Sequence, residues 1–466
     1  MSSKKLLEFF DKSFVISCPQ MTLTQLVTNS PKVYQGSGSV TRTSSRQLEL
    51  KLLYSDNVSY SSFLGEVFED YGDKTGKIIS DKSAGIGRLV PEDRYFDLNA
   101  TDDQGRVWTS KRFLIDKSSQ SNQITITAQL YKISHTAQVL SDENPSLRLQ
   151  LSEIINIPFS VGETKEGEPT LIDHVNFTAC GYEFIIRHES NGTLIEVTPN
   201  SGDLPAFIET RVCEALQFVV GVSISWSTLE LKQSDQKTIA IQAESNRDSR
   251  DKQIKPLPPI RFNSIDTNED IWNLYAKYVC HILTYPKEEF HPMSGWVGRV
   301  IDANSPIVEK RILVLSVAIE GLLEIDIFKE KLMINRAKTI KIQVSELLDK
   351  VEEMKLEKTL NDRTTNFLNS INANPIRPID KLNELSKEGL LDKKLVSSWK
   401  KNRDDFAHGR TIEREEIKKY SILCGQLNVL FNHLIFLIIG YTGKYTDYSE
   451  EGWIKKDFNS LFDRSN

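Results

Sequence analysis

Residues Trp399–Arg410 read WKKNRDDFAHGR and form the end of a predicted helix, which decides how the C-terminal part of the chain is interpreted. Leu391, Leu395, Trp399 and Arg403 follow one another at intervals of four, which places them on one stripe of that helix. Arg403 therefore continues an apolar stripe. Because a guanidinium keeps its charge and is rarely left unpaired in a core, we expect Arg403 to face an acidic partner or an interface.

His408 follows Arg403 after five positions. On an ideal helix, at about 100° per residue, the two side chains are roughly 140° apart and do not share a narrow face. Gly409 is well placed to end the helix as a left-handed cap, which leaves His408 in the last turn, where the helix dipole favours imidazolium. A histidine that titrates near neutral pH beside a fixed cation suits phosphodiester chemistry, because one group transfers protons and the other stabilises an anionic phosphorane.

This stretch resembles the signature of the HEPN superfamily. The matching elements are Arg403, the polar Asp404, three variable positions and His408, on a late helix of an all-α domain. Trp399 and the ending formed by residues 407–409 resemble the ApeA-type branch of that superfamily in particular. The resemblance covers roughly the last 160 to 200 residues and implies a helical-bundle fold for them.

The resemblance also implies an activity. HEPN ribonucleases are typically metal-independent and dimeric, with the arginine and histidine of two protomers in one cleft. At the matching positions, Arg403 would stabilise the pentavalent phosphate and His408 would act as general acid or base. Asp404 would orient one of them, no cofactor would be needed, and the product would be a cyclic 2′,3′-phosphate.

ApeA-like proteins are bacterial anti-phage systems of the abortive-infection type. By resemblance, the chain would be a homodimer through its HEPN domain that cleaves cellular RNA on infection, with tRNA as one candidate. The N-terminal part would restrain or trigger the nuclease in response to a phage-derived signal.

Composition limits how RNA would be bound. The chain has 466 residues, which at roughly 150 residues per domain predicts two or three domains, and a net charge of -6, which favours a local basic patch over a generally positive surface. Such a patch lies around residues 393–410, where six cations face two acids. They are Lys393, Lys394, Lys400, Lys401, Arg403 and Arg410 against Asp404 and Asp405. We expect Lys400, Lys401 and Arg410 to contact RNA; the alternative is a solvated face of mixed charge.

The same composition predicts a soluble, cytoplasmic protein without a membrane partner. The five cysteines, Cys18, Cys180, Cys213, Cys280 and Cys424, form no C-x-x-C pair, and we expect them to be reduced, with neither a disulfide framework nor a zinc site. The N-terminus does not read as a secretory signal. The longest apolar run, at residues 434–440, is far shorter than the roughly 20 residues that span a bilayer.

Hydrophobic periodicity predicts an α+β protein of several domains. Residues 1–245 alternate in short segments at 47–52, 123–128, 182–186 and 193–197, which predicts a mostly antiparallel, sandwich-like or curled sheet serving as a sensor or regulatory domain. Residues 206–220 have a helical period instead. Residues 246–300 are assigned to a linker and connecting helix, because residues 245–259 are polar and then proline-rich.

Residues 301–466 are assigned to the HEPN helical-bundle nuclease domain. Counting the connecting helix, the predicted helices are 269–283, 307–328, 338–357, 380–388, 392–408 and 411–441. Thr411 is the expected N-cap of the last helix, because three acids follow it in the first turn.

Glu320 interrupts the apolar stretch 313–319, so we expect its carboxylate to be buried and to pair with Arg403 or His408 as a supporting residue of the site. The alternative is a residue at the rim, paired with a lysine. His281 and His291 flank Glu288 and Glu289 in a weak metal-like cluster, but no ligand pair has helical spacing and we expect no metal.

Two other functions remain open. A catalytically silent HEPN module would bind RNA or a protein. Alternatively, the β domain is a ligand-binding sandwich with an aromatic pocket around Tyr71, Tyr95 or Trp108, and the helices serve only for dimerisation, with Arg403 ion-paired and closed to solvent.

Overall fold

A computed structural model describes most of the chain. The described residues are 13–26, 30–54, 90–120, 123–138, 144–151, 155, 161–163, 169–171, 174–189, 192–233, 235–244, 257–261, 268–285, 290–325, 334–373, 376–407 and 411–458. The chain divides into two compact units. The sheet unit comprises Met1–Ile155, Gly162–Glu209 and Ser225–Arg247, and the helical unit comprises Asn156–Val161, Thr210–Ile224 and Asp248–Asn466.

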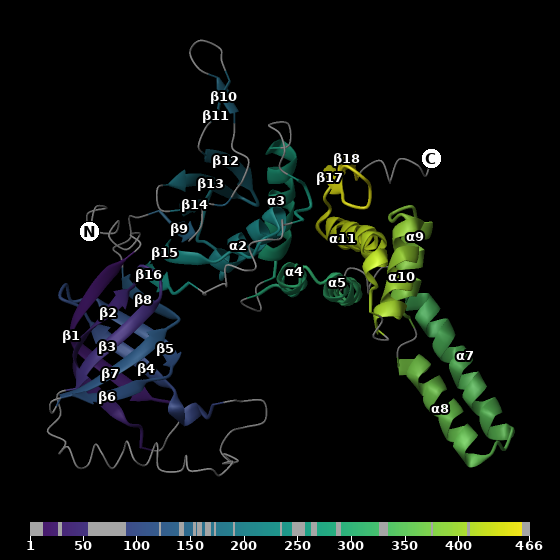
Figure 1. Ribbon diagram of the computed structural model, residues 1–466, viewed down its shortest axis with the longest axis horizontal. Coiled ribbons are helices and arrows are strands. Elements are labelled where there is room, and N and C mark those ends of the chain that lie inside the picture. The colour runs from purple at the N-terminus through teal and green to yellow at the C-terminus, as the bar shows by residue number, and fades with distance from the viewer. Residues whose placement is uncertain are drawn as a thin grey trace. The chain divides into compact units, whose positions relative to one another are not determined.

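The large sheet of the sheet unit contains fourteen described strands, and every neighbouring pair is antiparallel. Their order is β12-β13-β14-β9-β15-β16-β8-β5-β4-β1-β2-β3-β7-β6 (Figure 1). The strands are β1 (Phe14–Gln25), β2 (Val33–Arg42), β3 (Leu48–Tyr54), β4 (Phe96–Thr101), β5 (Val107–Phe113), β6 (Asp116–Gln120), β7 (Gln123–Leu130), β8 (Lys132–Gln138), β9 (Ser146–Leu151), β12 (His174–Ala179), β13 (Tyr182–Glu189), β14 (Gly192–Pro199), β15 (Trp226–Lys232) and β16 (Gln236–Gln242). Two short strands, β10 (Val161–Glu163) and β11 (Pro169–Leu171), pair separately.

The strands predicted from alternation are present. Leu48, Leu50 and Leu52 of β3 are buried while Glu49 and Lys51 between them are exposed, because successive side chains of a strand point to opposite faces. In Figure 1 the strands β1 to β8 curl around one another. Their buried faces, with two isoleucines of β16, form one hydrophobic core.

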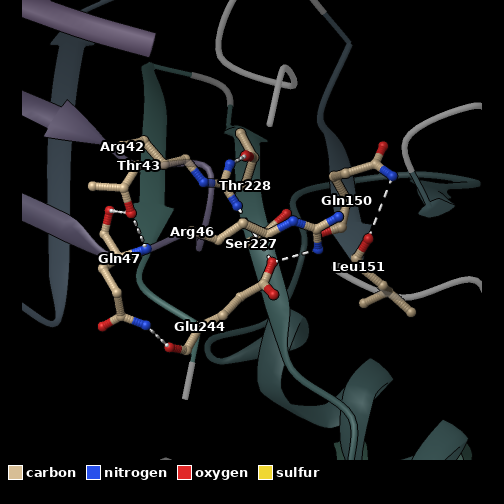
Figure 2. A network of polar contacts seen from close by, with 9 residues as sticks. All are labelled: Arg42, Thr43, Arg46, Gln47, Gln150, Leu151, Ser227, Thr228 and Glu244. Carbon is tan, nitrogen blue, oxygen red and sulfur yellow. Dashed lines mark hydrogen bonds and ion pairs between the residues drawn. The ribbon is translucent and has the colours of Figure 1, made fainter. Parts of the chain in front are cut away.

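A polar network joins the end of β2 to β15 and β16 (Figure 2). The Arg42 side chain is 2% exposed, donates to Thr228 Oγ1 at 3.4 Å and lies 3.6 Å from Glu244. Arg46 donates to the same carboxylate at 2.6 Å, and Gln47 donates to the Glu244 carbonyl at 2.6 Å. Burial lowers the pKa of Arg42 to about 10, and Glu244 opposes that effect. The carboxylate therefore compensates a cation that the sheet has removed from water.

The described helices of the chain alternate with short connections. They are α2 (Ile208–Val220), α3 (Asn268–Leu283), α4 (Pro292–Asp302), α5 (Val308–Leu322), α7 (Ile334–Glu353), α8 (Lys358–Ala373), α9 (Pro378–Lys387), α10 (Lys393–Ala407) and α11 (Ile417–Ile439), and a hairpin of β17 (Lys444–Asp447) and β18 (Ile454–Asp457) follows the last helix. A mainly antiparallel sheet region followed by a helical region confirms the α+β class.

The division into units differs from the domain boundaries at 245 and 300. Most of α2, which confirms the helical period at 206–220, belongs to the helical unit, and so do α3 and α4. The reason is packing. Tyr275 of α3 donates to the carbonyl of Val212 at 3.4 Å, and the rings of Phe218 and Tyr278 stack with centroids 4.7 Å apart.

Some helix ends differ from the sequence prediction. The N-cap expected at Thr411 is wrong, because residues 411–413 are not helical and a 3₁₀ turn at Arg414–Glu416 precedes α11. The backbone N–H of Ile412 instead donates to Glu309 of α5 at 3.1 Å. Helices α4 and α8 were not predicted at all.

Helix α11 is the most deeply buried helix of the described chain. Residues 414–439 are long and apolar enough to cross a membrane, which the short apolar run in the sequence did not suggest, but 83% of the apolar window is buried within the fold. Gly440 ends the helix in the left-handed conformation, with φ of 62°. His433 of α11 is 1% exposed among Phe436, Tyr445 and Phe458, and neither ring nitrogen bonds another described residue. Burial lowers the pKa of His433 to about 3.

Replacement of Glu244 should destabilise the sheet unit. Glu244→Gln leaves the buried Arg42 without a counter-charge, and because Glu244 is 21% exposed the expected cost is roughly 1–3 kcal/mol rather than the ~3–5 kcal/mol of a fully buried pair. Hydrogen exchange of β2 and β16 peptides measures the loss. Lys111→Ala, at an ion pair where the lysine is 77% exposed, is the matched control and should change stability by less than about 0.5 kcal/mol. Equal effects in the two variants would show that Arg42 does not depend on Glu244.

Acid should destabilise the helical unit through His433. Its pKa falls from 6.5 in the unfolded chain to about 3 in the fold, so the stability of the neutral form is complete above pH 6.5 and is lost as pH falls towards 3. Between pH 7 and pH 5 this loss is about 2 kcal/mol. Thermal unfolding at both pH values should show a smaller acid loss in His433→Phe, whereas His174→Gln, on the exposed end of β12, should behave like wild type. An unchanged acid loss in His433→Phe would contradict the prediction.

Candidate functional site

Helices α5 and α10 lie against each other at the predicted site. Trp399 is 3% exposed and donates its indole N–H to the carbonyl of Ser316 at 3.3 Å. One turn further along both helices, Arg403 Nε donates to Glu320 Oε1 at 2.8 Å. Because both contacts advance by four residues on each helix, α5 and α10 run in the same direction here. The buried tryptophan therefore fixes the register in which the ion pair forms.

The expected contact between Glu320 and Arg403 is present, but its setting differs from the prediction. The Arg403 side chain is 47% exposed and Glu320 is 29% exposed, so neither group is buried. Burial of Glu320 was inferred from its apolar neighbours in sequence. Two of those neighbours, Leu313 and Val317, are themselves 43% and 46% exposed and share its face of α5.

The exposure of the pair limits what it contributes to stability. An ion pair between partly exposed side chains is worth about 0.2–1 kcal/mol, because water competes for both charges. The pair is therefore better suited to holding the guanidinium in one orientation than to holding the fold together. The Arg403 guanidinium, which Glu320 of α5 orients, remains accessible to a ligand from solvent.

The structure places only part of the remaining site. Lys400 and Lys401 are exposed on α10, and so are Lys393 and Lys394 at its start, so the described part of the basic patch faces solvent. Asp404 lies in the backbone of α10, which ends at Ala407. The side chain of Asp404, and His408 and Arg410 entirely, lie outside what the structure describes. The meeting of Arg403 with His408 therefore stays a prediction.

A second polar cluster, in the helical unit, was only partly anticipated. Arg211 and Glu214 of α2 form an ion pair at 2.9 Å, with side chains 1% and 8% exposed. Glu214 also accepts from the backbone N–H of His291 at 2.9 Å, and Arg211 donates to the carbonyl of Tyr285 at 3.0 Å. Burial raises the pKa of Glu214. These contacts connect α2 to the segment that precedes α4. Arg211 and Glu214 have the i,i+3 spacing of a helical ion pair, but that spacing does not indicate that the pair is buried.

The histidines of the weak metal-like cluster do come together. The rings of His281 and His291 lie 5.5 Å apart, and His291 Nδ1 accepts from the backbone N–H of Met293 as the N-cap of α4. Burial lowers the pKa of both rings, that of His291 to about 3, which keeps Nδ1 available as an acceptor. Glu288 and Glu289 lie outside the described residues. Within the described chain, no three His, Cys, Asp or Glu side chains form a group that could hold a metal ion.

Tyr95 and Trp108, the two described aromatic residues of the alternative β-domain site, do not form one surface. Trp108 is 0% exposed and donates its indole N–H to Asp102 at 2.9 Å inside the sheet core. The guanidinium of Arg112 lies over the ring of Tyr95, with Cζ 4.4 Å from the ring centroid. Tyr71 and the surrounding loop 63–73 lie outside the described residues. A pocket lined by Trp108 would require the core to open.

The cysteines match the expectation of reduced thiols in part. Cys18, Cys213 and Cys424 are free and buried. The expectation is wrong for Cys180 and Cys280, which are not free thiols.

Comparison of the chain with protein-family models, with curated proteins and with solved structures finds no match. The functional argument therefore rests on the residues of α5 and α10 and on the sequence that follows them.

The ion pair of the site should contribute little to stability. Glu320→Gln should lower the free energy of unfolding by less than about 1 kcal/mol, because both groups are partly exposed. The contrasting variant is Lys381→Met on α9, since Lys381 is 7% exposed and donates to the Leu323 carbonyl and to Glu324, both at 2.8 Å. That change should cost about 1–3 kcal/mol, because it leaves a buried carbonyl without a donor. Chemical denaturation compares the variants, and a larger loss in Glu320→Gln would make the Arg403 pair structural.

Proposed function

We propose that this chain is a metal-independent endoribonuclease of the HEPN type that acts in anti-phage defence. Arg403 and His408 are its catalytic residues, Asp404 orients one of them, and Glu320 positions Arg403. Lys400, Lys401 and Arg410 bind the RNA backbone. The sheet unit acts as the sensor or regulatory part, and the protein works in the cytoplasm as a homodimer.

The observation that carries the proposal is the setting of Arg403. Within a single chain, a purely structural arginine would be closed to solvent between helices. Arg403 is instead 47% exposed and oriented by a carboxylate on the neighbouring helix. Exposed lysines at 400 and 401 lie on the same helix. A fixed cation with basic residues beside it is the arrangement that a phosphodiester requires.

The chemistry follows from these groups. One His408 removes the proton from a ribose 2′-hydroxyl, whose oxygen attacks the adjacent phosphorus. Arg403 stabilises the additional negative charge on the phosphorane, and the bond from phosphorus to the 5′-oxygen breaks. The leaving oxygen takes a proton from a second His408, and a cyclic 2′,3′-phosphate and a 5′-hydroxyl result. A single imidazole does not easily serve both ends of an in-line displacement, so a second copy of the chain supplies the other.

The exposed face of α5 offers a surface for that second copy. Leu313 and Val317 are 43% and 46% exposed and lie on the face that carries Glu320. A partner that covers these two side chains would bring its own Arg403 towards the same edge of the site. We therefore place the homodimer contact along this face of α5.

The function is tested by RNA integrity and phage protection in cells that express the chain. His408→Ala and Arg403→Ala should each abolish RNA fragmentation and protection. Loss of an acid–base group lowers rates by about 10²–10⁴-fold, and loss of a group that stabilises transition-state charge by about 10²–10³-fold. Arg363→Ala, at an exposed arginine of α8, is the control and should behave like wild type. Both catalytic variants should keep the dimer, measured by sedimentation velocity. Cleavage by purified protein should persist in EDTA.

Three results would contradict the proposal. Protection that survives His408→Ala would assign the function to binding or to the sheet unit. Unfolding of Arg403→Ala would make Arg403 structural. Strict dependence of cleavage on Mg²⁺ would exclude the mechanism.

A further inference from the structure

A cavity lies inside the helical unit, on the side of α5 opposite the candidate site. Its walls come from α2, α4, α5, α11 and residues 257–259. Arg311 lines it, nine positions before Glu320 on α5, which on an ideal helix places the two about 180° apart. The cavity measures about 520 Å³ with its open mouth included.

Among the residues that the structure describes, Arg311 is the only charged one that lines this cavity. It is partly buried and forms neither an ion pair nor a side-chain hydrogen bond with any other described residue. Its charge reaches α11, because it lowers the pKa of the Cys424 thiol against the larger raising effect of burial. A partly buried guanidinium without a counter-ion favours an anion in its place.

Two buried amides on α11 face the same space. Asn432 donates Nδ2 to Asn428 Oδ1 at 3.0 Å, and their residues are 5% and 7% exposed. This bond uses one group of each amide. Among the described residues, the NH₂ of Asn428 and the carbonyl oxygen of Asn432 have no further partner. Both residues line the cavity beside Arg311, so this donor and this acceptor can bond a polar ligand group there.

Apart from Asn304, the remaining wall is apolar, with Phe218, Val297 and Phe431 among its residues. Convergent polar groups in an otherwise apolar concavity are typical of small-molecule sites. We infer that this cavity binds a small organic carboxylate, whose oxygens contact Arg311 and the free amide donor of Asn428 while its apolar body packs against the aromatic wall. The described lining contains no carboxylate that would repel it.

The site is tested on the full chain with benzoate as the probe, by saturation-transfer NMR and by its effect on the unfolding temperature. Wild type should bind benzoate saturably and be stabilised by it. Arg311→Gln should weaken binding by at least about tenfold, and so should Asn428→Ala if the first variant fails to fold, because a charge-assisted or buried hydrogen bond is lost. Arg363→Gln on α8 is the matched control and should bind like wild type. Benzyl alcohol keeps the ring without the charge, and it should bind wild type no more tightly than it binds Arg311→Gln.

The absence of saturable benzoate binding would overturn the inference, as would equal binding by wild type and Arg311→Gln. Inorganic phosphate is the second probe. Binding of phosphate without benzoate would overturn the assignment of a carboxylate with an apolar body. None of these readouts depends on RNA cleavage, so the cavity and the nuclease can fail separately.

Discussion

Burial of α11 on all sides is the constraint on which the helical unit depends. The helix contacts α3, α5, α10 and β17, and almost every residue from Cys424 to Ile439 is buried. Such a helix must obtain its stability from packing, since its apolar surface has no solvent face. It also carries polar side chains into the core. Each needs a hydrogen-bond partner there, because an unpaired buried polar group lowers the stability of the fold.

The polar residues of α11 differ in how fully they are hydrogen-bonded. Gln426 accepts from Ser398 of α10 at 2.6 Å, which fixes α10 against the core. Asn428 and Asn432 satisfy each other only in part and face the cavity. His433 forms no side-chain hydrogen bond with another described residue, and burial keeps its ring neutral. One buried helix therefore positions the candidate site, borders the cavity and makes the unit sensitive to acid.

Much of the fold could be predicted from local pattern. The alternation at 47–52 predicted β3, because only one face of that segment is buried. The segment 193–197 also forms a strand, β14, although Thr193, Leu194 and Ile195 are all buried there. Helix α4 escaped prediction because Gly295 and Gly298 lower its helix propensity, and its N-cap is the unusual His291. Helix α8 is rich in Thr, Asn and Asp and buries little beyond Leu368, so it lacks a clear apolar period.

Individual residues of the site could be predicted from the pattern of a single helix. Their surroundings, which several helices build together, could not. The contact between Arg403 and Glu320 could be inferred because each charge interrupts an apolar stretch. The exposure of the two side chains could not be inferred, because it depends on which face of α5 the other helices leave uncovered. The bonds from Glu214 to His291 and from Arg211 to Tyr285, and the cavity at Arg311, bring together segments far apart in sequence. No spacing rule connects such residues.

Helix α5 relates the two proposals physically. One face carries Glu320, which orients Arg403 at the surface, and the opposite face carries Arg311 inside the cavity. A helix of this length moves as a rigid element, because its backbone hydrogen bonds resist local deformation. An anion that fixes Arg311 against α11 would therefore restrict the same helix that orients Arg403. Since Trp399 sets the register between α5 and α10, a shift of α5 would alter the position of the guanidinium before it altered the fold.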